Sequence, residues 1–278
     1  MQNIDTPPLV SIFCITYNHS SYIRQCLDGF LIQKTNFPFE VLIHDDASTD
    51  DTAGIIKEYE AKYPDIIKPI YQVENQYSKG LDINIVYNLP RARGKYIAMC
   101  EGDDYWIDPL KLQKQVDFLE NNLDYSFCCH RFKIYDQEEN KWENEYAAEC
   151  YKDNQHLYIT RKIFFEHWVT QPLTAVIRKE KFNEARFSMY RYKYSRDVHL
   201  FYHLLKRGKG IVLNDIMGVY RIHKGGIASK KESLIKLRRG FFIYKELYLN
   251  NIMDMRLCKL FVYYAIFYYK HNKKTLLY

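Results

Sequence analysis

The sequence predicts an α/β fold in which helices flank a mainly parallel sheet, followed by a C-terminal helical extension. In roughly the first 120 residues, short apolar runs lead into polar turns and then into amphipathic stretches. Such alternation is typical of a parallel sheet, because parallel strands need a crossover connection, usually a helix. From about Lys230 the chain instead combines aromatic and basic side chains in helix-like segments. The sequence therefore predicts one sheet-based domain and one helical appendage.

The composition is that of a globular chain. Its 278 residues are 47% hydrophobic and 27% charged, enough for one large α/β domain with or without an appendage, which excludes collagen-like and low-complexity classes. The seven cysteines are an odd number, without CxxC or metal-type spacing, so we expect reduced thiols. Neither a secretory signal nor a run of roughly 18 apolar residues is apparent, so we expect a cytoplasmic protein.

The first half alternates strands and helices. Val10 to Thr16 lies in an apolar run, and Asn18 to Ser21 can cap the helix that follows it. Pro90 breaks a short helix, and Asp108 with Pro109 supplies an N-cap and a first-turn proline. The predicted strands are 9–17, 40–44, 66–73 and 95–100, and the predicted helices are 22–32, one ending near residue 64, 82–88, and one running from 108 through 119.

The second half has a looser pattern. We predict a strand over 125–135, an irregular acidic loop over 136–153, a helix from Ser195 to Gly208, and a strand over 211–223. We divide the chain into a domain over 1–228, with halves 1–120 and 121–228, and a helical extension over 229–278.

Polar motifs follow three of the predicted strands. They are Thr16-Tyr17-Asn18, Asp45-Asp46 and Asp103-Asp104. In an open α/β sheet, ligands bind beyond the carboxyl ends of the strands, so we expect these motifs to form one site. A divalent cation such as Mg²⁺ or Mn²⁺ prefers carboxylate oxygens and leaves positions open for phosphate oxygens. No glycine-rich phosphate loop follows the first strand, so we expect a metal shared with a diphosphate.

These motifs jointly resemble the family-2 glycosyltransferases with the GT-A fold. The resemblance runs from Val10-Ser11-Ile12 and Thr16-Tyr17-Asn18, through the segment 45–50, to Gly94-Lys95-Tyr96-Ile97 and Glu101-Gly102-Asp103-Asp104. It implies a Rossmann-like GT-A domain and an inverting enzyme that moves a sugar from a nucleoside diphosphate, usually uridine diphosphate, to an acceptor hydroxyl. Residues 1–120 would then bind the nucleotide sugar and residues 121–228 the acceptor. We expect the enzyme to act in bacterial surface polysaccharide or glycolipid synthesis.

The resemblance also implies a donor pocket. Tyr17 would stack on the base, Asp46 would accept a hydrogen bond from its imide N–H, and Thr16, Asn18 and Asp45 would line the same pocket. Stacking on tyrosine contributes roughly 1 to 3 kcal/mol per base. Neutral cytosine lacks the imide donor, so we favour uridine or thymidine; core packing is the alternative for Tyr17. The implied donor-binding residues are Thr16, Tyr17, Asn18, Asp45, Asp46, Asn84, Asp103 and Arg221.

The same resemblance implies a metal site for Mn²⁺ or Mg²⁺ made by Asp103, Asp104 and His223. Asp104 would bind the metal directly, and Asp103 would contact the ribose or a metal-bound water. In the segment Tyr220-Arg221-Ile222-His223, Arg221 would lie near the diphosphate. His223 would complete the metal shell or donate to a phosphate oxygen, with a plain surface histidine as the alternative.

Asp197 is the candidate general base. The resemblance places a carboxylate at the start of a helix, where this sequence has Ser195-Arg196-Asp197, with Arg196 at the position often held by glutamate. The alternative role of Asp197 is to stabilise the helix N-terminus. Trp106 is the candidate acceptor-binding residue, as a wall on which a sugar stacks; a buried core tryptophan is the alternative.

The segment 230–278 holds much of the aromatic excess, interleaved with lysine and arginine. Helices of this kind can lie in a bilayer interface, so we expect peripheral contact with the inner face of the cytoplasmic membrane, close to a saccharide or lipid-linked saccharide acceptor. A helix packed on the catalytic domain or on a dimer partner is the alternative.

Two other function classes compete. A metal-dependent nucleotidyl- or phosphotransferase also needs clustered carboxylates at strand ends. A nucleic-acid-binding protein would explain the basic and aromatic residues, but the net charge of +6 is modest and acidic motifs repel phosphate. We therefore expect no nucleic-acid partner.

Overall fold

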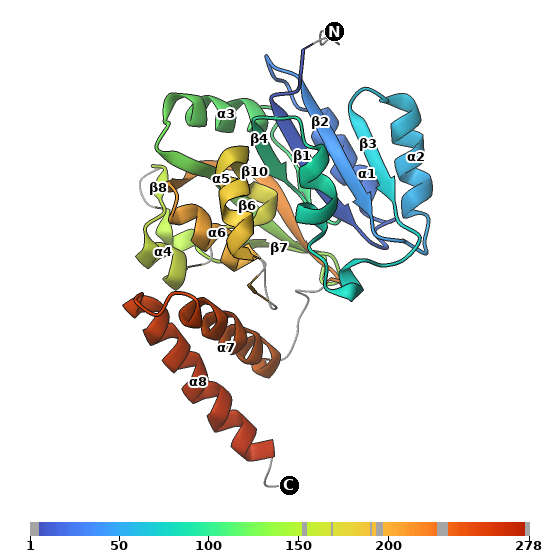
Figure 1. Cartoon of the computed structure of the whole chain (residues 1–278). Coiled ribbons are helices and arrows are strands. Elements are labelled where there is room, and N and C mark those ends of the chain that lie inside the picture. The colour runs from blue at the N-terminus through green and yellow to red at the C-terminus, as the bar shows by residue number, and fades with distance from the viewer. Residues whose placement is uncertain are drawn as a thin grey trace.

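The computed structural model describes residues 6–151, 155–167, 169–189, 191–192, 197–226 and 233–275. A single mixed sheet with the strand order β3-β2-β1-β4-β9-β6-β10-β5 forms the centre of the fold, and helices cover both faces (Figure 1). The predicted GT-A type α/β arrangement is confirmed.

Four parallel strands build the N-terminal half of the sheet. They are β1 (Val10–Thr16), β2 (Phe39–Asp45), β3 (Ile67–Tyr71) and β4 (Tyr96–Met99). Each matches a strand predicted from an apolar run. Every residue of β2 is buried, as expected for a parallel strand covered on both faces. The register sets Thr16 beside Asp45, so the ends of β1 and β2 are level.

Three helices form as predicted. The helix α1 (Ile23–Leu31) connects β1 to β2, α2 (Thr52–Lys62) connects β2 to β3, and α3 (Lys111–Asn121) follows β4 in the chain. The Asp108 carboxylate accepts the backbone N–H of Leu110 at 2.7 Å, just before α3 begins. The predicted helix over 82–88 is a π-helical turn, η2 (Asn84–Asn88), followed by a 3₁₀ turn, η3 (Leu89–Arg91). Pro90 lies in the first turn of η3, where its missing N–H costs nothing.

The second half adds strands of both directions. The predicted strands appear as β6 (Tyr125–Asp136) and β10 (Lys209–Ile222), which pair in parallel. The short β9 (Val176–Arg178) runs antiparallel between β4 and β6, and β5 (Tyr105–Trp106) pairs antiparallel with the edge of β10. These short strands escape detection because three residues or fewer carry no periodic pattern.

Several elements lie where the sequence predicts none. The predicted irregular loop 136–153 contains β7 (Lys141–Asn144), an exposed strand paired with β6, and the 3₁₀ turn η4 (Ala148–Cys150). The remaining elements are β8 (Leu157–Tyr158), α4 (Arg161–Glu166), η5 (Pro172–Thr174), α5 (Lys179–Met189) and η1 (Tyr77–Lys79). The predicted helix near Ser195 is α6 (Asp197–Leu205); Ser195 and Arg196 lie outside the described residues.

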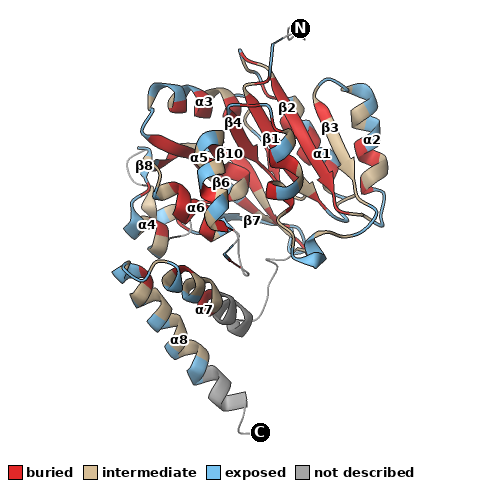
Figure 2. Cartoon of the chain, in the orientation of Figure 1, coloured by how far each residue is buried: buried red, intermediate tan, exposed pale blue. Residues whose placement is uncertain are grey.

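Most of the central sheet is buried, as the red strands of Figure 2 show. Alternate residues of the strands face two cores, one on each side of the sheet. Ile12 and Cys14 of β1 pack with α1, α2 and α3, whereas Phe13 points to the other side and packs with α5 and α6. This two-residue alternation gives each helix layer its own apolar face.

The C-terminal extension is a hairpin of α7 (Ser233–Leu249) and α8 (Met255–Thr275), which projects from the sheet domain (Figure 1). Its rings pack on each other: the centroids of Phe241 and Tyr268 are 4.6 Å apart, and those of Tyr244 and Tyr264 are 5.0 Å apart. Leu247 and Leu257 join the core beside α5 and α6. Within the described part of the chain, no helix combines the length and apolar character that crossing a bilayer requires.

Candidate functional site

The three polar motifs meet at the carboxyl edge of the parallel strands. The backbone N–H of Asp46 donates to Thr16 O at 2.9 Å, and that of Gly102 donates to Ile15 O at 2.9 Å. A Cβ at position 102 would lie 2.6 Å from Thr16 Oγ1, so only glycine lets the turn after β4 cross so close to β1. The Thr16 side chain is consequently buried under this turn and lines no open pocket.

The turns after β1 and β2 hold each other. Asn18 has φ 55°, a left-handed conformation that asparagine tolerates, and its Oδ1 accepts the Thr49 N–H at 2.7 Å. The Asn18 N–H donates to Ser48 Oγ at 2.9 Å, and Ser48 in turn donates to the buried Asp45 carboxylate. Burial raises the pKa of Asp45. Asn18 and Asp45 thus hold the two turns together by hydrogen bonds. The Tyr17 side chain, 43% exposed, lies at the rim of the site.

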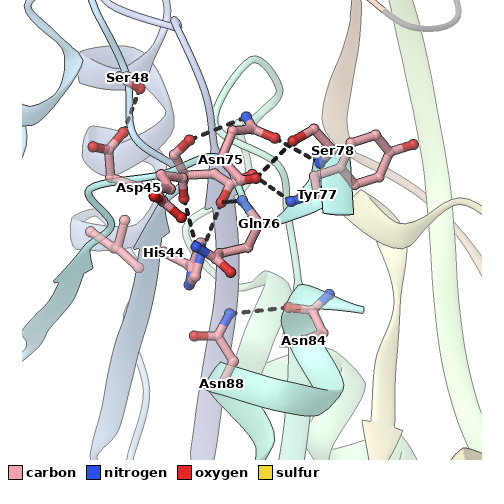
Figure 3. A network of polar contacts seen from close by, with 12 residues as sticks. His44, Asp45, Ser48, Asn75, Gln76, Tyr77, Ser78, Asn84 and Asn88 are labelled. Carbon is pink, nitrogen blue, oxygen red and sulfur yellow. Dashed lines mark hydrogen bonds and ion pairs between the residues drawn. The ribbon is translucent and has the colours of Figure 1, made fainter. Parts of the chain in front are cut away.

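Asp46 ties the end of β2 to the loop after β3. Its Oδ1 accepts the Gln76 N–H at 2.8 Å and its Oδ2 accepts the Tyr77 N–H at 3.0 Å, and His44 Nε2 lies 3.3 Å from Oδ1 (Figure 3). The carboxylate is buried and both oxygens accept hydrogen bonds from the protein, so it holds this loop; its contact with the base stays a prediction. Asn84 Oδ1 accepts from Asn88 Nδ2 at 3.1 Å below this network, and its role in donor binding stays a prediction.

A carboxylate and two histidines form the centre of the site. Asp103 Oδ2 lies 3.0 Å from His223 Nε2 and 3.7 Å from His19 Nε2. The two imidazole planes are nearly perpendicular, at 88°. Within the described residues, the buried Asp103 Oδ1 and His19 Nδ1 have no hydrogen-bond partner. Burial lowers the pKa of His19, which favours the neutral ring that a metal needs. These donors fit a divalent cation.

Asp104 and Arg221 lie directly behind this centre. Asp104 is buried, and its Oδ1 accepts the backbone N–H of Arg221 at 2.8 Å; burial, followed by the charge of Asp103, raises its pKa well above the usual value. Arg221 Nε donates to Asp103 O at 2.8 Å, and its two terminal nitrogens donate to Gln137 and Gln25. These bonds hold both side chains in place, and the roles of Asp104 as a metal ligand and of Arg221 as a phosphate ligand stay predictions.

Glu101 lies within electrostatic range of both Asp103 and Asp197. Glu101 reaches solvent, yet the pKa of its carboxyl is raised to about 8, first by desolvation among the surrounding groups and then by the charges of Asp103 and Asp197. Asp197 is the first residue of α6 and is exposed there. The carboxylates of Glu101 and Asp197 interact electrostatically although they come from distant segments of the chain.

Trp106 does not form the expected acceptor wall. It is 2% exposed, its Nε1 donates to Leu173 O at 2.8 Å, and its ring packs against Phe30 with centroids 4.8 Å apart. The ammonium of Lys111 lies 3.9 Å from the ring centroid. The indole is thus a core side chain, which corrects the sequence-based prediction.

Sequence reasoning missed His19 and Glu101 as site residues. His19 was interpreted as part of a helix-capping turn, but α1 begins after Tyr22 and no side chain caps it. The available signal was position: both residues follow a strand at the carboxyl edge, in the same motifs as Asn18 and Asp103. A histidine there can face a carboxylate from a neighbouring strand, which spacing along the chain does not reveal.

Comparison with known proteins gives consistent results. A sequence model described as Glycosyl transferase family 2 matches residues 11–186. The putative teichuronic acid biosynthesis glycosyltransferase TuaG of Bacillus subtilis is 28% identical over 93% of this chain and 95% of its own length. The uncharacterized protein Rv1520 of Mycobacterium tuberculosis is 50% identical over 45% of this chain, a match that spans 35% of that relative's length. Staphylococcus aureus TarS 1–349, solved with UDP-GlcNAc, has the same fold: TM-score 0.68, 18% identity, covering 92% of this chain and 71% of that chain.

Proposed function

This chain belongs to glycosyl transferase family 2, and from that premise we propose that it transfers a sugar from a nucleoside-diphosphate sugar to an acceptor hydroxyl. The observation that carries the proposal is the cluster of Asp103, His19 and His223 at the carboxyl edge of the sheet. Glu101 precedes this cluster in the same turn and is within electrostatic range of Asp197. A UDP-sugar is the favoured donor and a dTDP-sugar the second, in line with the UDP-GlcNAc bound to TarS.

Different residues at the rim of the site would bind different parts of the donor. Tyr17 presents its ring to solvent at the end of β1, where a base can stack on it for roughly 1 to 3 kcal/mol. Asp103 and His223 would hold a divalent cation, Mn²⁺ or Mg²⁺, which when bound offsets the negative charge of the diphosphate. Arg221 fixes the backbone of Asp103 and so keeps its carboxylate aimed at the two histidines.

Asp197 acts as the general base. Its exposed carboxylate at the N-terminus of α6 takes the proton of the acceptor hydroxyl as that oxygen attacks the anomeric carbon. Attack from the face opposite the diphosphate inverts the configuration. The N-terminal end of a helix favours the ionised carboxylate that this step needs.

The acceptor is a saccharide or a lipid-linked saccharide used in surface polysaccharide or glycolipid synthesis. The similarity to TuaG, which is named for teichuronic acid biosynthesis, supports this class. The hairpin of α7 and α8 exposes Ile252, Met253 and Met255 at its tip beside Arg256. Such a tip can insert into the inner face of the cytoplasmic membrane, where a lipid-linked acceptor is found.

Product analysis tests the proposal. The full chain is incubated with Mn²⁺, a panel of UDP- and dTDP-sugars, and membrane or saccharide extracts as acceptors. Release of nucleoside diphosphate with sugar transfer is the expected result. Release of pyrophosphate would instead identify the competing nucleotidyl transfer and overturn the assignment.

A further inference from the structure

We infer that His19 is a third protein ligand of the cation, and that the resulting two-histidine, one-carboxylate set selects a transition-metal ion such as Mn²⁺ over Mg²⁺. The inference rests on the proposed function only in that a cation lies beside Asp103. It adds a ligand from the turn after β1 to those from the turn after β4 and the end of β10.

The distances agree with a shared ion. Ligand atoms at about 2.0 to 2.2 Å from one cation lie about 3.0 to 3.5 Å from one another in tetrahedral or octahedral geometry. Asp103 Oδ2 lies 3.0 Å from His223 Nε2 and 3.7 Å from His19 Nε2, and ligand atoms of all three residues fall within 4.8 Å of one another. One shared ion would draw the His19 ring toward Asp103 and His223.

The surrounding contacts hold both rings in place. The backbone N–H of His19 donates to Thr52 Oγ1 at 2.8 Å, which ties the turn after β1 to the start of α2. The Tyr22 ring contacts both imidazoles, with centroids 6.2 Å from His19 and 4.5 Å from His223. His19 is thus positioned before any ion arrives, which lowers the conformational cost of ligation.

Unused donor capacity is the second observation. Asp103 Oδ1 and His19 Nδ1 are buried without a hydrogen-bond partner among the described residues. Leaving buried polar atoms unpaired is costly, so such atoms call for an ion or water. An ion pair between Asp103 and His223 alone would leave Asp103 Oδ1 unexplained, whereas a cation held by both carboxylate oxygens would engage it. A His19 ring that binds the ion through Nε2 leaves its Nδ1 to a water.

The chemistry of the donor set decides which ion it takes. Mg²⁺ prefers oxygen ligands and retains several waters, whereas imidazole nitrogen favours Mn²⁺, Co²⁺ and Zn²⁺ progressively more. Two imidazoles out of three protein ligands therefore disfavour Mg²⁺. The site that the sequence suggested, Asp103, Asp104 and His223, contains one imidazole and would discriminate less between these ions.

Counting nitrogen ligands tests the inference directly. The full chain is loaded with Mn²⁺ and UDP, and ¹⁴N couplings are measured by pulsed electron paramagnetic resonance. We expect two histidine nitrogens in the wild type, one in His19→Ala, one in His223→Ala, and two in the control His156→Gln, whose histidine is exposed away from the cluster. A single nitrogen in the wild type, or a spectrum unchanged in His19→Ala, overturns the inference.

Metal competition supplies a second readout. We expect that displacing half of the Mn²⁺ from the wild type needs at least roughly a tenfold excess of Mg²⁺. In His19→Asp, where an oxygen ligand replaces a nitrogen ligand, the required Mg²⁺ excess should be about tenfold smaller. Equal excess in both proteins contradicts the inference. Neither measurement requires sugar transfer: two nitrogens without transfer leave the ligand set standing and refute the proposed function, whereas transfer with a single nitrogen does the reverse.

Discussion

Asp197 combines exposure with a position at a helix N-terminus, two properties that suit a base acting on an incoming hydroxyl. We expect Asp197→Asn to lower kcat by roughly 10² to 10⁴, the usual contribution of a general base, while the dissociation constant for UDP changes little. Steady-state kinetics and calorimetry measure the two quantities. The control Glu180→Gln removes an exposed carboxylate from the first turn of α5 and should leave kcat unchanged; a fully active Asp197→Asn enzyme would refute the assignment.

Lys111 shows how burial of one charge sets a pH dependence of stability. Its ammonium is fully buried, donates to Gln115 Oε1 at 2.9 Å, and has its pKa lowered to about 7 by burial. The unfolded chain keeps this proton up to about pH 10.5, so between these values the unfolded state binds more protons and the free energy of unfolding rises with pH.

Replacing that charge should therefore stabilise the protein most at low pH. We expect Lys111→Met to raise the free energy of unfolding at pH 7, with a gain that shrinks as the pH rises toward 10. Urea titrations at pH 7 and 9.5 compare it with wild type and with Lys34→Met, which removes an exposed lysine and should show no such trend. A gain that is the same at both pH values would contradict the explanation.

At the level of elements, the C-terminal hairpin packs on the domain at its base and exposes apolar side chains at its tip. Leu247 and Leu257 pack into the core beside α6, so removing the hairpin would uncover that core. The tip, by contrast, leaves Met253 91% exposed and Met255 68% exposed. Point changes at the tip therefore test membrane contact better than truncation does.

We expect the double change Met253→Glu and Met255→Glu to reduce co-flotation with anionic liposomes several-fold, because burying a carboxylate among lipid tails is unfavourable. Thermal unfolding should be unchanged, since neither side chain packs in the core. Leu123→Glu, at an exposed leucine that follows α3, is the matched control. Equal flotation of all three proteins would remove the membrane proposal and favour a hairpin that only packs on the domain.

At the scale of the whole molecule, the site depends on residues far apart in the chain. The contact between His223 and Asp103 spans 120 positions and exists because β10 lies in the same sheet as the parallel strands and ends beside the turn after β4. We expect a donor bound across this junction to contact both halves of the domain and so to stabilise the folded state as a unit.

We expect UDP with Mn²⁺ to raise the melting temperature by several degrees at concentrations well above the dissociation constant, since only the folded state binds the ligand. Differential scanning fluorimetry measures the shift. UDP alone, and CDP with Mn²⁺, should give smaller shifts. A shift that does not depend on the metal would argue against a cation at Asp103.

The sequence by itself determined the strands and helices of the first half, the edge of the sheet at which the site lies, and the family. Local patterns suffice there: apolar runs such as 10–16 make buried strands, and polar turns follow them at the same edge. The second half of the domain has a weaker sequence pattern. Its elements, such as β9 and α5, are short or have few apolar positions, so they form only through packing.

Only the tertiary structure decided which polar side chains face the site. Asp104 shares a motif with Asp103, and Arg221 shares one with His223. Asp104 Oδ1 nevertheless accepts a backbone N–H, and Arg221 Nε donates to a backbone carbonyl. Whether a carboxylate binds its own protein or a ligand depends on which donors the fold brings within about 3 Å of it. Those donors come from distant segments, as His19 and His223 do at Asp103, and no local pattern specifies them.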